Sequence, residues 1–211
     1  MSLTIMKIML VLGIIGHALN MYCDRILSIF PNGTLKLEDI KTFGKDDKMA
    51  KLMEGVSEKV PMRSAILGSF ALMLQFLGYF AMTGYVYEHS KVYGSILFVS
   101  IVLFIIIGTA HHVKYGLVEY VFIKLGRDAK AKALMLDLFN SAPITRVCYL
   151  GYLVFIFTLI IAIISGTATL PLWSAMFTIL PVFIILFPFR IIGTLHISAM
   201  VSQEVSKGDA A

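Results

Sequence analysis

The sequence predicts an all-α protein, a polytopic bundle of helices that cross a membrane. Its 211 residues are 58% hydrophobic and only 15% charged, whereas soluble chains carry about a quarter charged residues. The mean hydropathy of +0.86 points the same way. From Val147 to Phe189 there is no Asp, Glu, Lys or Arg, and a run of about 18 such residues is typical of a membrane-spanning segment. These observations exclude a water-soluble enzyme.

Five spans are expected within one transmembrane domain that covers residues 1–211. The first, over about residues 3–29, ends at the turn Pro31-Asn32-Gly33. The second, over about 62–86, follows Pro61, a residue suited to a helix start. The third, over about 92–125, is longer than a bilayer requires at about 1.5 Å per residue. Its end should therefore project into water.

The last two spans are uncharged over most of their length. The fourth covers about 145–164 and closes at Ser165-Gly166. The fifth is expected to cover about 172–205 as one helix, kinked at Pro181, at Pro188 or at both. A split at Pro188 would give six spans, but neither piece would then be long enough to cross.

The positively charged residues predict the orientation. They gather in and beside two polar connectors, 31–60 and 126–144: Lys36, Lys41, Lys45, Lys48, Lys51 and Lys59 in the first, and Lys124, Arg127, Lys130, Lys132 and Arg146 in or beside the second. Because cytoplasmic loops carry an excess of Lys and Arg, both connectors should be cytosolic, the N-terminus outside and the C-terminus inside. The expected location is the plasma membrane, as a multi-pass protein of a bacterial inner membrane.

The basic balance of the chain does not indicate nucleic acid as a partner. The net charge is +5, but no basic stripe with interleaved aromatic residues is present. Membrane lipids are the expected partner, and a homo-oligomer is left open. Cys23 and Cys148 are expected as free thiols. Glycines in the first two spans have the small-residue spacing that lets membrane helices approach closely: Gly13, Gly16, Gly68, Gly78 and Gly84.

Polar residues inside the spans are the candidate site, because such groups are costly in a membrane and usually functional. In the first span, His17, Asn20 and Asp24 are spaced to share one helix face. The third span carries the adjacent His111 and His112. Further candidates are Gln75 and Tyr79 in the second span, Tyr115 and Glu119 in the third, and Arg190 and His196 in the fifth.

Asp24, one of the two adjacent histidines and Arg190 are expected at one depth, in the cytosolic leaflet. A purely structural explanation also exists for them. Arg190 could extend its charged end to the interface, and Asp24 could pair with its neighbour Arg25. We nevertheless regard this layer as the place where a function would reside.

Three functions fit this layer. The leading hypothesis is a membrane-embedded enzyme acting on a lipid or other hydrophobic substrate by His/Asp acid–base chemistry. Asp24, His111 and His112 would be catalytic, and the substrate would be bound by His17, Asn20, Gln75, Tyr79, Tyr115, Glu119, Arg190 and His196, with Arg190 holding an anionic group. The alternatives are a small proton-coupled transporter or channel, in which His and Asp relay protons, and a structural or partner subunit of a membrane complex.

No cofactor follows from the sequence. A divalent metal remains open, because one Asp with two or three His is a minimal ligand set, but no residue is assigned as a metal ligand. The adjacent His111 and His112 point about 100° apart on a helix. Haem is not expected, because dihaem cytochrome b subunits pair four histidines across opposite membrane sides, whereas only His17 and His89 lie away from the cytosolic side here.

Short motifs along the chain resemble an uncharacterised family of bacterial polytopic integral membrane proteins. They are Gly13-Ile14-Ile15-Gly16 and Asp24-x-Ile26-Leu27 in the first span, Gly108-Thr109-Ala110-His111 in the third, and Leu170-Pro171-x-Trp173 before the last. The resemblance covers most of the chain and implies a multi-helix membrane fold without implying a reaction. It favours Asp24 and His111 as the residues to test.

Overall fold

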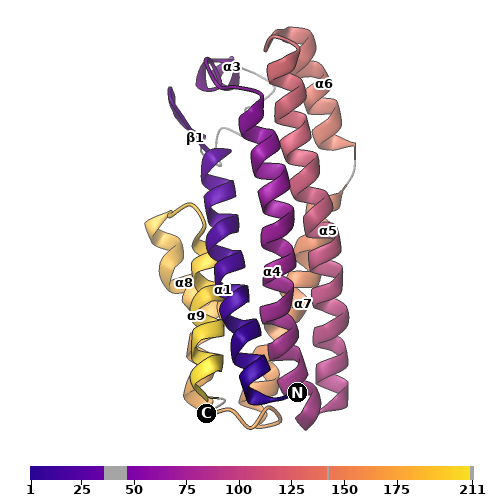
Figure 1. Cartoon of the computed structure of the whole chain (residues 1–211), viewed down its shortest axis with the longest axis vertical. Coiled ribbons are helices and arrows are strands. Elements are labelled where there is room, and N and C mark those ends of the chain that lie inside the picture. Colours follow the sequence, from indigo (N-terminus) through magenta and orange to yellow (C-terminus); the bar gives the residue numbers. More distant parts are fainter. Residues whose placement is uncertain (36–46, 142, 210–211) are drawn as a thin grey trace.

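The computed structural model describes residues 1–35, 47–141 and 143–209, and these residues fold almost entirely into helices (Figure 1). Four long helices form the body: α1 (Leu3–Ile26), α4 (Lys59–His89), α5 (Lys91–Lys124) and α7 (Ile144–Ile164). By length and composition, four helical stretches could cross a membrane, namely α1, α4, α5 and a stretch over Ala129–Ile164 that contains α7. The bounds of these four helices lie close to those of the first four predicted spans.

The long helices alternate in direction. α1 packs on α4, α4 on α5, and α5 on α7. Both termini lie at one end of the bundle, here called the termini end (Figure 1). The opposite end, here called the connector end, carries a small hairpin, β1 (Ile29–Phe30) and β2 (Gly33–Thr34), together with α3 (Lys48–Leu52) and α6 (Ala129–Asn140). Lys36, Lys41 and Lys45 of the first connector lie outside the described residues.

Local signals in the sequence explain where the helices begin and turn. The Ser2 hydroxyl accepts a hydrogen bond from the Ile5 amide and caps α1, and Ser90 caps α5 by accepting from the Tyr93 amide. After α1, the chain folds back through the antiparallel hairpin, in which Phe30 is opposite Gly33. Gly33 has a φ of 137°, a conformation that glycine adopts readily, so the predicted turn at Pro31-Asn32-Gly33 is confirmed.

Glycine allows α1 and α4 to touch along their backbones. A Cβ atom added to Gly16 would lie 2.6 Å from the Gln75 nitrogen and 2.7 Å from the Ala71 oxygen. One added to Gly13 would lie 2.7 Å from the Gly78 Cα. Only glycine leaves room for this approach, which agrees with the small-residue packing expected of the first two spans.

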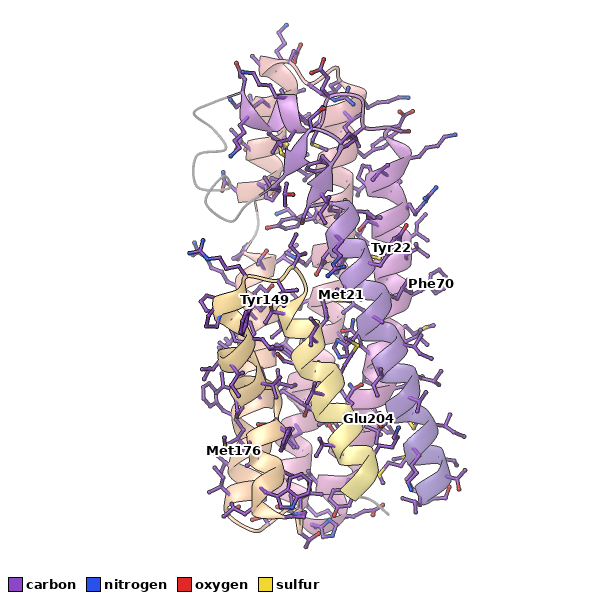
Figure 2. All side chains as sticks on the ribbon, turned by 90° about the vertical axis from the view of Figure 1, so that its left-hand side faces the viewer. Met21, Tyr22, Phe70, Tyr149, Met176 and Glu204 are labelled. Carbon is purple, nitrogen blue, oxygen red and sulfur yellow. The ribbon has the colours of Figure 1, made fainter. Side chains whose placement is uncertain are left out.

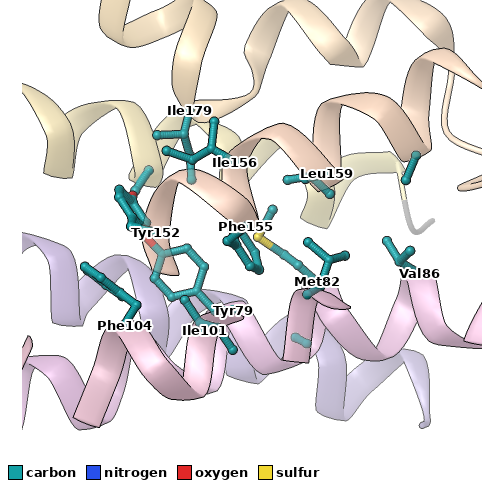
Figure 3. Packing of buried hydrophobic residues seen from close by; sticks show 14 of the residues in the cluster. Tyr79, Met82, Val86, Ile101, Phe104, Tyr152, Phe155, Ile156, Leu159 and Ile179 are labelled. Atoms are coloured by element: carbon teal, nitrogen blue, oxygen red, sulfur yellow. The ribbon is translucent and has the colours of Figure 1, made fainter. Parts of the chain in front are cut away.

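Apolar side chains form two buried clusters and also cover the outside. In the larger cluster, Tyr79 of α4 lies against Phe104 of α5 and Phe155 of α7 (Figure 3). A smaller cluster at the connector end joins α3, α6 and the last turns of α5: Phe30, Met49, Leu52, Met53, Val56, Val118, Phe122, Ile123, Ala131 and Met135. Exposed apolar residues such as Phe70 and Met176 project from the sides of the bundle (Figure 2).

The predicted fifth span, one kinked helix over 172–205, is wrong. The chain instead forms a helical hairpin from four pieces: η1 (Leu172–Phe177), α8 (Ile179–Leu186), η2 (Phe187–Phe189) and α9 (Thr194–Asp209). Pro188 lies in η2, and the turn that follows has left-handed backbone at Arg190, with φ 50°, and at Gly193, with φ 89°. These conformations reverse the chain rather than bend it.

Because of this reversal, α9 runs antiparallel to α1. His196 near the start of α9 contacts Asn20, while Gln203, two turns later, lies against Gly13. The C-terminal end of α9 consequently lies at the termini end, beside the N-terminus (Figure 1). The sequence pattern predicted the two ends of the chain on opposite sides. Pro188 was expected to kink one long helix, because the apolar pattern does not reveal the positive φ angles of Arg190 and Gly193 beyond it.

Candidate functional site

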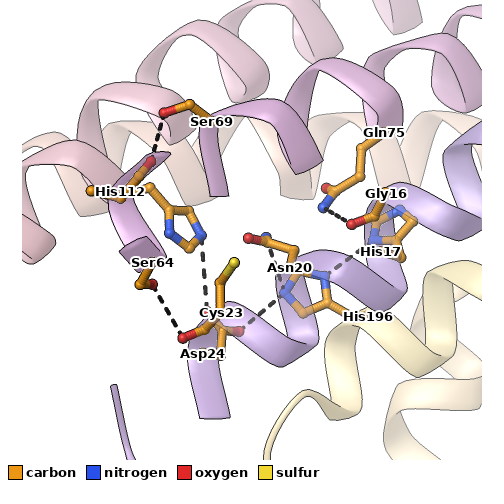
Figure 4. A network of polar contacts seen from close by, with 11 residues as sticks. Gly16, His17, Asn20, Cys23, Asp24, Ser64, Ser69, Gln75, His112 and His196 are labelled. Atoms are coloured by element: carbon orange, nitrogen blue, oxygen red, sulfur yellow. Dashed lines mark hydrogen bonds and ion pairs between the residues drawn. The ribbon is translucent and has the colours of Figure 1, made fainter. Parts of the chain in front are cut away.

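Polar side chains from three helices meet where α9 crosses α1, toward the connector end (Figure 4). We call His17, Asn20 and Asp24 of α1, His112 of α5 and His196 of α9 the Asp24 cluster. The three α1 residues share one face of the helix, as their spacing predicted, and each of them contacts His196.

His196 is the centre of this cluster, because both of its ring nitrogens have partners. Its Nε2 lies 3.1 Å from the Asp24 Oδ2 and 3.2 Å from the Asn20 Nδ2. Its Nδ1 lies 3.1 Å from the Nδ1 of His17. Two ring nitrogens form a hydrogen bond only when one carries a proton and the other does not, so a single proton lies between the two imidazoles.

His112 approaches the same carboxylate from α5. Its Nε2 lies 3.8 Å from the Asp24 Oδ1. Gly68 of α4 makes room for this ring, since a Cβ added there would lie 2.7 Å from the His112 Nδ1. Asp24 therefore lies between two imidazoles, one at each oxygen.

Exposure falls steeply from one end of the cluster to the other. The Asp24 side chain is 35% exposed, and the His112 and His196 side chains are each 12% exposed. His17 is only 1% exposed, and its Nε2 has no hydrogen-bond partner among the described residues. The contacts Asp24–His196–His17 thus lead from a solvent-accessible carboxylate to an imidazole in the bundle interior.

His111, which was predicted as a catalytic residue together with Asp24 and His112, forms its hydrogen bond with α7 instead. Its Nδ1 lies 2.9 Å from the Thr145 Oγ1 of α7, and its ring lies 4.2 Å from that of Tyr115. The hydroxyl of Tyr115 also reaches Thr145, at 3.5 Å. Since successive residues point in different directions on a helix, His111 and Tyr115 contact α7 while His112 contacts Asp24.

Two candidates on α4 border the cluster. The Gln75 amide donates to the Gly16 carbonyl at 3.3 Å, and its own Oε1 has no partner among the described residues. The Tyr79 ring packs edge-on against His17 with centroids 5.4 Å apart. Its hydroxyl is bonded to that of Tyr152 at 2.7 Å. Tyr79 therefore encloses His17 without offering it a hydrogen bond.

Glu119 and Arg190 occupy other positions. Glu119 follows His112 by two helical turns, about 10.5 Å along α5. Its side chain is buried, and its Oε2 has no hydrogen-bond partner within the described part of the chain. Arg190 is exposed in the turn before α9. No three His, Cys, Asp or Glu side chains among residues 1–35, 47–141 and 143–209 are grouped as a metal site would require.

Sequence reasoning missed Gln203 of α9. This side chain is fully buried, and neither of its amide atoms has a hydrogen-bond partner among the described residues. It lies against Gly13 and Gly78, where added Cβ atoms would come within 2.6 and 2.7 Å of its amide. The available signal was its spacing of seven residues from His196, which places both on one face of a helix.

Comparison with known proteins identifies the family of this chain. The model of a family described as a family of unknown function (DUF6796) matches residues 1–203, and the chain belongs to that family. Neither the curated proteins nor the solved structures contain a match to the chain. The family description assigns no residue a role, so the function is argued from the geometry of the Asp24 cluster.

Proposed function

We propose that this DUF6796 member is an integral membrane protein that transfers protons, as a small proton-coupled transporter or channel. One observation carries the proposal. The contacts Asp24–His196–His17 form an unbroken series from a carboxylate that is 35% exposed to an imidazole that is 1% exposed. Ionisable groups inside a helix bundle are costly and mark ion pathways and proton relays in membrane proteins.

The helices support the membrane part of this proposal. Four helical stretches are long and apolar enough to span, and large apolar side chains cover the outside of the bundle, where lipid tails would contact them. Asp24 follows Leu3 by 21 residues, or about 31 Å along α1, which is close to the hydrocarbon thickness of a bilayer of about 30 Å. Asp24 would accordingly lie at one membrane surface.

The charges of the connectors support an orientation. The described lysines and arginine of the two connectors belong to elements at the connector end, namely α3, the start of α4, and the turn after α5 with the start of α6 (Figure 1): Lys48, Lys51, Lys59, Arg127, Lys130 and Lys132. By the positive-inside rule this end is cytosolic, and the hairpin of α8 and α9 enters and leaves from the outer side. Both termini are then outside. A bacterial inner membrane remains the proposed location.

The tautomers of the two histidines supply the transfer step. In the first state, His196 donates its Nε2 proton to Asp24 and accepts the Nδ1 proton of His17 at its own Nδ1. A proton that arrives at the bare Nε2 of His17 displaces the His17 Nδ1 proton onto His196, and the His196 Nε2 proton passes to the Asp24 carboxylate. Each ring gains one proton and loses one.

Asn20 stabilises the state that results. His196 now has a bare Nε2, and the amide of Asn20, 3.2 Å away, can donate to it. The protonated Asp24, being partly exposed, releases its proton to the cytosolic surface. The first tautomer is restored when each ring rotates out of this contact, loses the proton from one nitrogen and gains one at the other. The same steps in reverse carry protons the other way.

The test is proton flux into liposomes that contain the purified protein and an internal pH-sensitive dye, driven by a potassium diffusion potential. Asp24→Asn and His196→Ala should each lower the flux about tenfold or more, because each removes a proton-carrying site. His89→Ala is the control, since His89 lies at the termini end and bonds to Thr169. Wild-type flux no greater than that of empty liposomes, or unchanged flux in Asp24→Asn, would overturn the proposal.

A lipid-directed enzyme is the second candidate, favoured by one feature. The exposed Asp24 carboxylate has an imidazole at each oxygen, at 3.1 and 3.8 Å, at the depth proposed for lipid headgroups. Such a group could act as a general acid–base. Lipid turnover by the purified protein that Asp24→Asn abolishes, without proton flux, would favour this candidate over the transporter.

A further inference from the structure

Gln203 of α9 has a buried amide that takes no part in the proton transfer along Asp24, His196 and His17, which we call the relay. It is 0% exposed, and its two polar atoms, Oε1 and Nε2, have no hydrogen-bond partner in residues 1–35, 47–141 and 143–209. Buried polar groups in proteins are nearly always hydrogen-bonded, and ordered water serves where no protein group does. At an amide that lies between Gly13 and Gly78, with no partner among the described residues, we therefore expect bound water.

This amide continues the line of the Asp24 cluster toward the termini end. Because α1 and α9 are antiparallel, the order along their contact is Asp24, His196 and His17, followed by Gln203 beside Gly13. On the Asp24 side of Gln203, the Nε2 of His17, where the proposed transfer receives its proton, likewise has no hydrogen-bond partner among the described residues.

Two small cavities lie farther along α9 toward the termini end. Ser206, one helical turn beyond Gln203, lines both of them. Their volumes are about 20 Å³ and about 10 Å³, the size that one or two water molecules occupy. The first is lined mostly by apolar side chains, such as Met6 of α1, with Ser206 and Tyr85 as its polar residues. The second combines apolar walls with the hydroxyl residues Ser174, Thr178, Ser202 and Ser206, so the second is the better site for water.

We propose that water bound at Gln203 connects the Nε2 of His17 with the cavities at Ser206, so that the protein carries the bare proton and excludes metal cations. This inference rests on the proposed proton transfer. It adds the part of the proton path between His17 and the outer membrane surface, and the selectivity for protons over metal cations. Water held by an amide and by hydroxyl groups passes a proton by exchanging hydrogen bonds, with no net movement of an atom heavier than hydrogen.

The same geometry is unsuitable for Na⁺ or K⁺. α1 and α4 approach so closely at Gly13 and Gly78 that a Cβ added to Gly13 would meet the Gly78 backbone at 2.7 Å, which leaves no passage for a hydrated ion between these two helices. Residues 3–16 of α1 contain no Asp or Glu, whereas sites for hard cations gather several oxygen ligands, usually with carboxylates.

The first experiment detects the water without measuring transport. The chain has only two glutamines, Gln75 and Gln203, so side-chain ¹⁵N labelling of glutamine gives two amide signals, which Gln75→Met assigns. Solid-state NMR in lipid bilayers then measures magnetisation transfer from water. We expect rapid transfer to the Gln203 amide. A Gln203 amide that receives none, in protein whose spectrum is otherwise intact, would overturn the water site.

The second experiment measures flux. Gln203→Leu should lower proton flux about tenfold or more, since it removes the groups that hold the water, while Glu204→Gln on the exposed side of α9 should leave the flux unchanged. Wild-type protein should carry no measurable Na⁺ or K⁺. If Gln203→Leu keeps its proton flux, or if wild type carries a Na⁺ current, the proposed water path is overturned. The relay itself still stands in that case, provided that Asp24→Asn loses flux. Absence of wild-type flux would instead overturn the relay, and the NMR result would then decide the water site separately.

Discussion

The Nδ1 atoms of His17 and His196 lie 3.1 Å apart, although 179 positions separate the two residues in the sequence. This contact joins the first helix to the last and completes the series that starts at Asp24. It also requires one proton between two rings, so each imidazole determines the tautomer of the other. Removing either ring should therefore affect its partner.

A double-mutant cycle tests this dependence. His17→Ala and His196→Ala should each destabilise the protein, but the double variant should be less destabilised than the sum of the two. The coupling should be about 0.5–3 kcal/mol, as for residues that share a hydrogen-bond network. The measurement is the free energy of unfolding in mild detergent. Strict additivity would mean that the two rings do not bond to each other in the protein.

Gly68 should be essential to the position of His112. In Gly68→Ala, the new Cβ would lie 2.7 Å from the His112 Nδ1, so the ring must move and lose its contact with Asp24. We expect a lower melting temperature and a lower proton flux. Gly84→Ala is the matched control, because its Cβ would meet only the Met1 side chain, at 3.6 Å. Equal behaviour of the two variants would contradict this role of Gly68.

Because the chain reverses between α8 and α9, we expect the two ends of the chain to lie on the same side of the membrane. Ser2→Cys and Gly208→Cys, in a chain whose native cysteines are replaced, should both be labelled by an impermeant thiol reagent from the same side of sealed vesicles. Glu54→Cys at the connector end should be labelled only from the other side. Labelling of Gly208→Cys together with Glu54→Cys would instead support the single fifth span that the sequence pattern predicted.

The sequence alone was enough to predict which residues share one face of a single helix. A helical period places His17, Asn20 and Asp24 on one face whatever surrounds them, and the same period separates His111 from His112. It did not reveal His196 as their common partner, because that contact depends on the chain reversal at Arg190 and Gly193. Backbone conformations of this kind are stabilised by tertiary packing and leave no periodic trace.

Gln203 escaped notice for a related reason. An amide in a polar terminal helix is ordinary as long as the helix is expected to emerge into the cytosol. It becomes exceptional only when α9 folds back and buries it against Gly13 and Gly78. The close-packing glycines of α1 and α4 were visible in the sequence, but the side chain that fills the space beside them was not.

Arg127 should hold the connector end together without taking part in proton transfer. Its guanidinium donates to the Met53 carbonyl at 3.0 Å and to the Val56 carbonyl at 2.5 Å, which ties the segment before α4 to the end of α5. Arg127→Ala leaves both part-buried carbonyls without this donor, at a cost of about 1–3 kcal/mol for an unsatisfied buried group.

The expected result of Arg127→Ala is local loosening of the smaller cluster around Met53. Limited proteolysis should cut near residues 53–58 faster than in wild type, whereas proton flux should be unchanged, because the Asp24 cluster makes none of these contacts. Lys132→Ala, which removes a cation paired with Asp47 on the same end of the molecule, is the control for charge alone. Loss of flux in Arg127→Ala would mean that the connector end and the relay are coupled through α5.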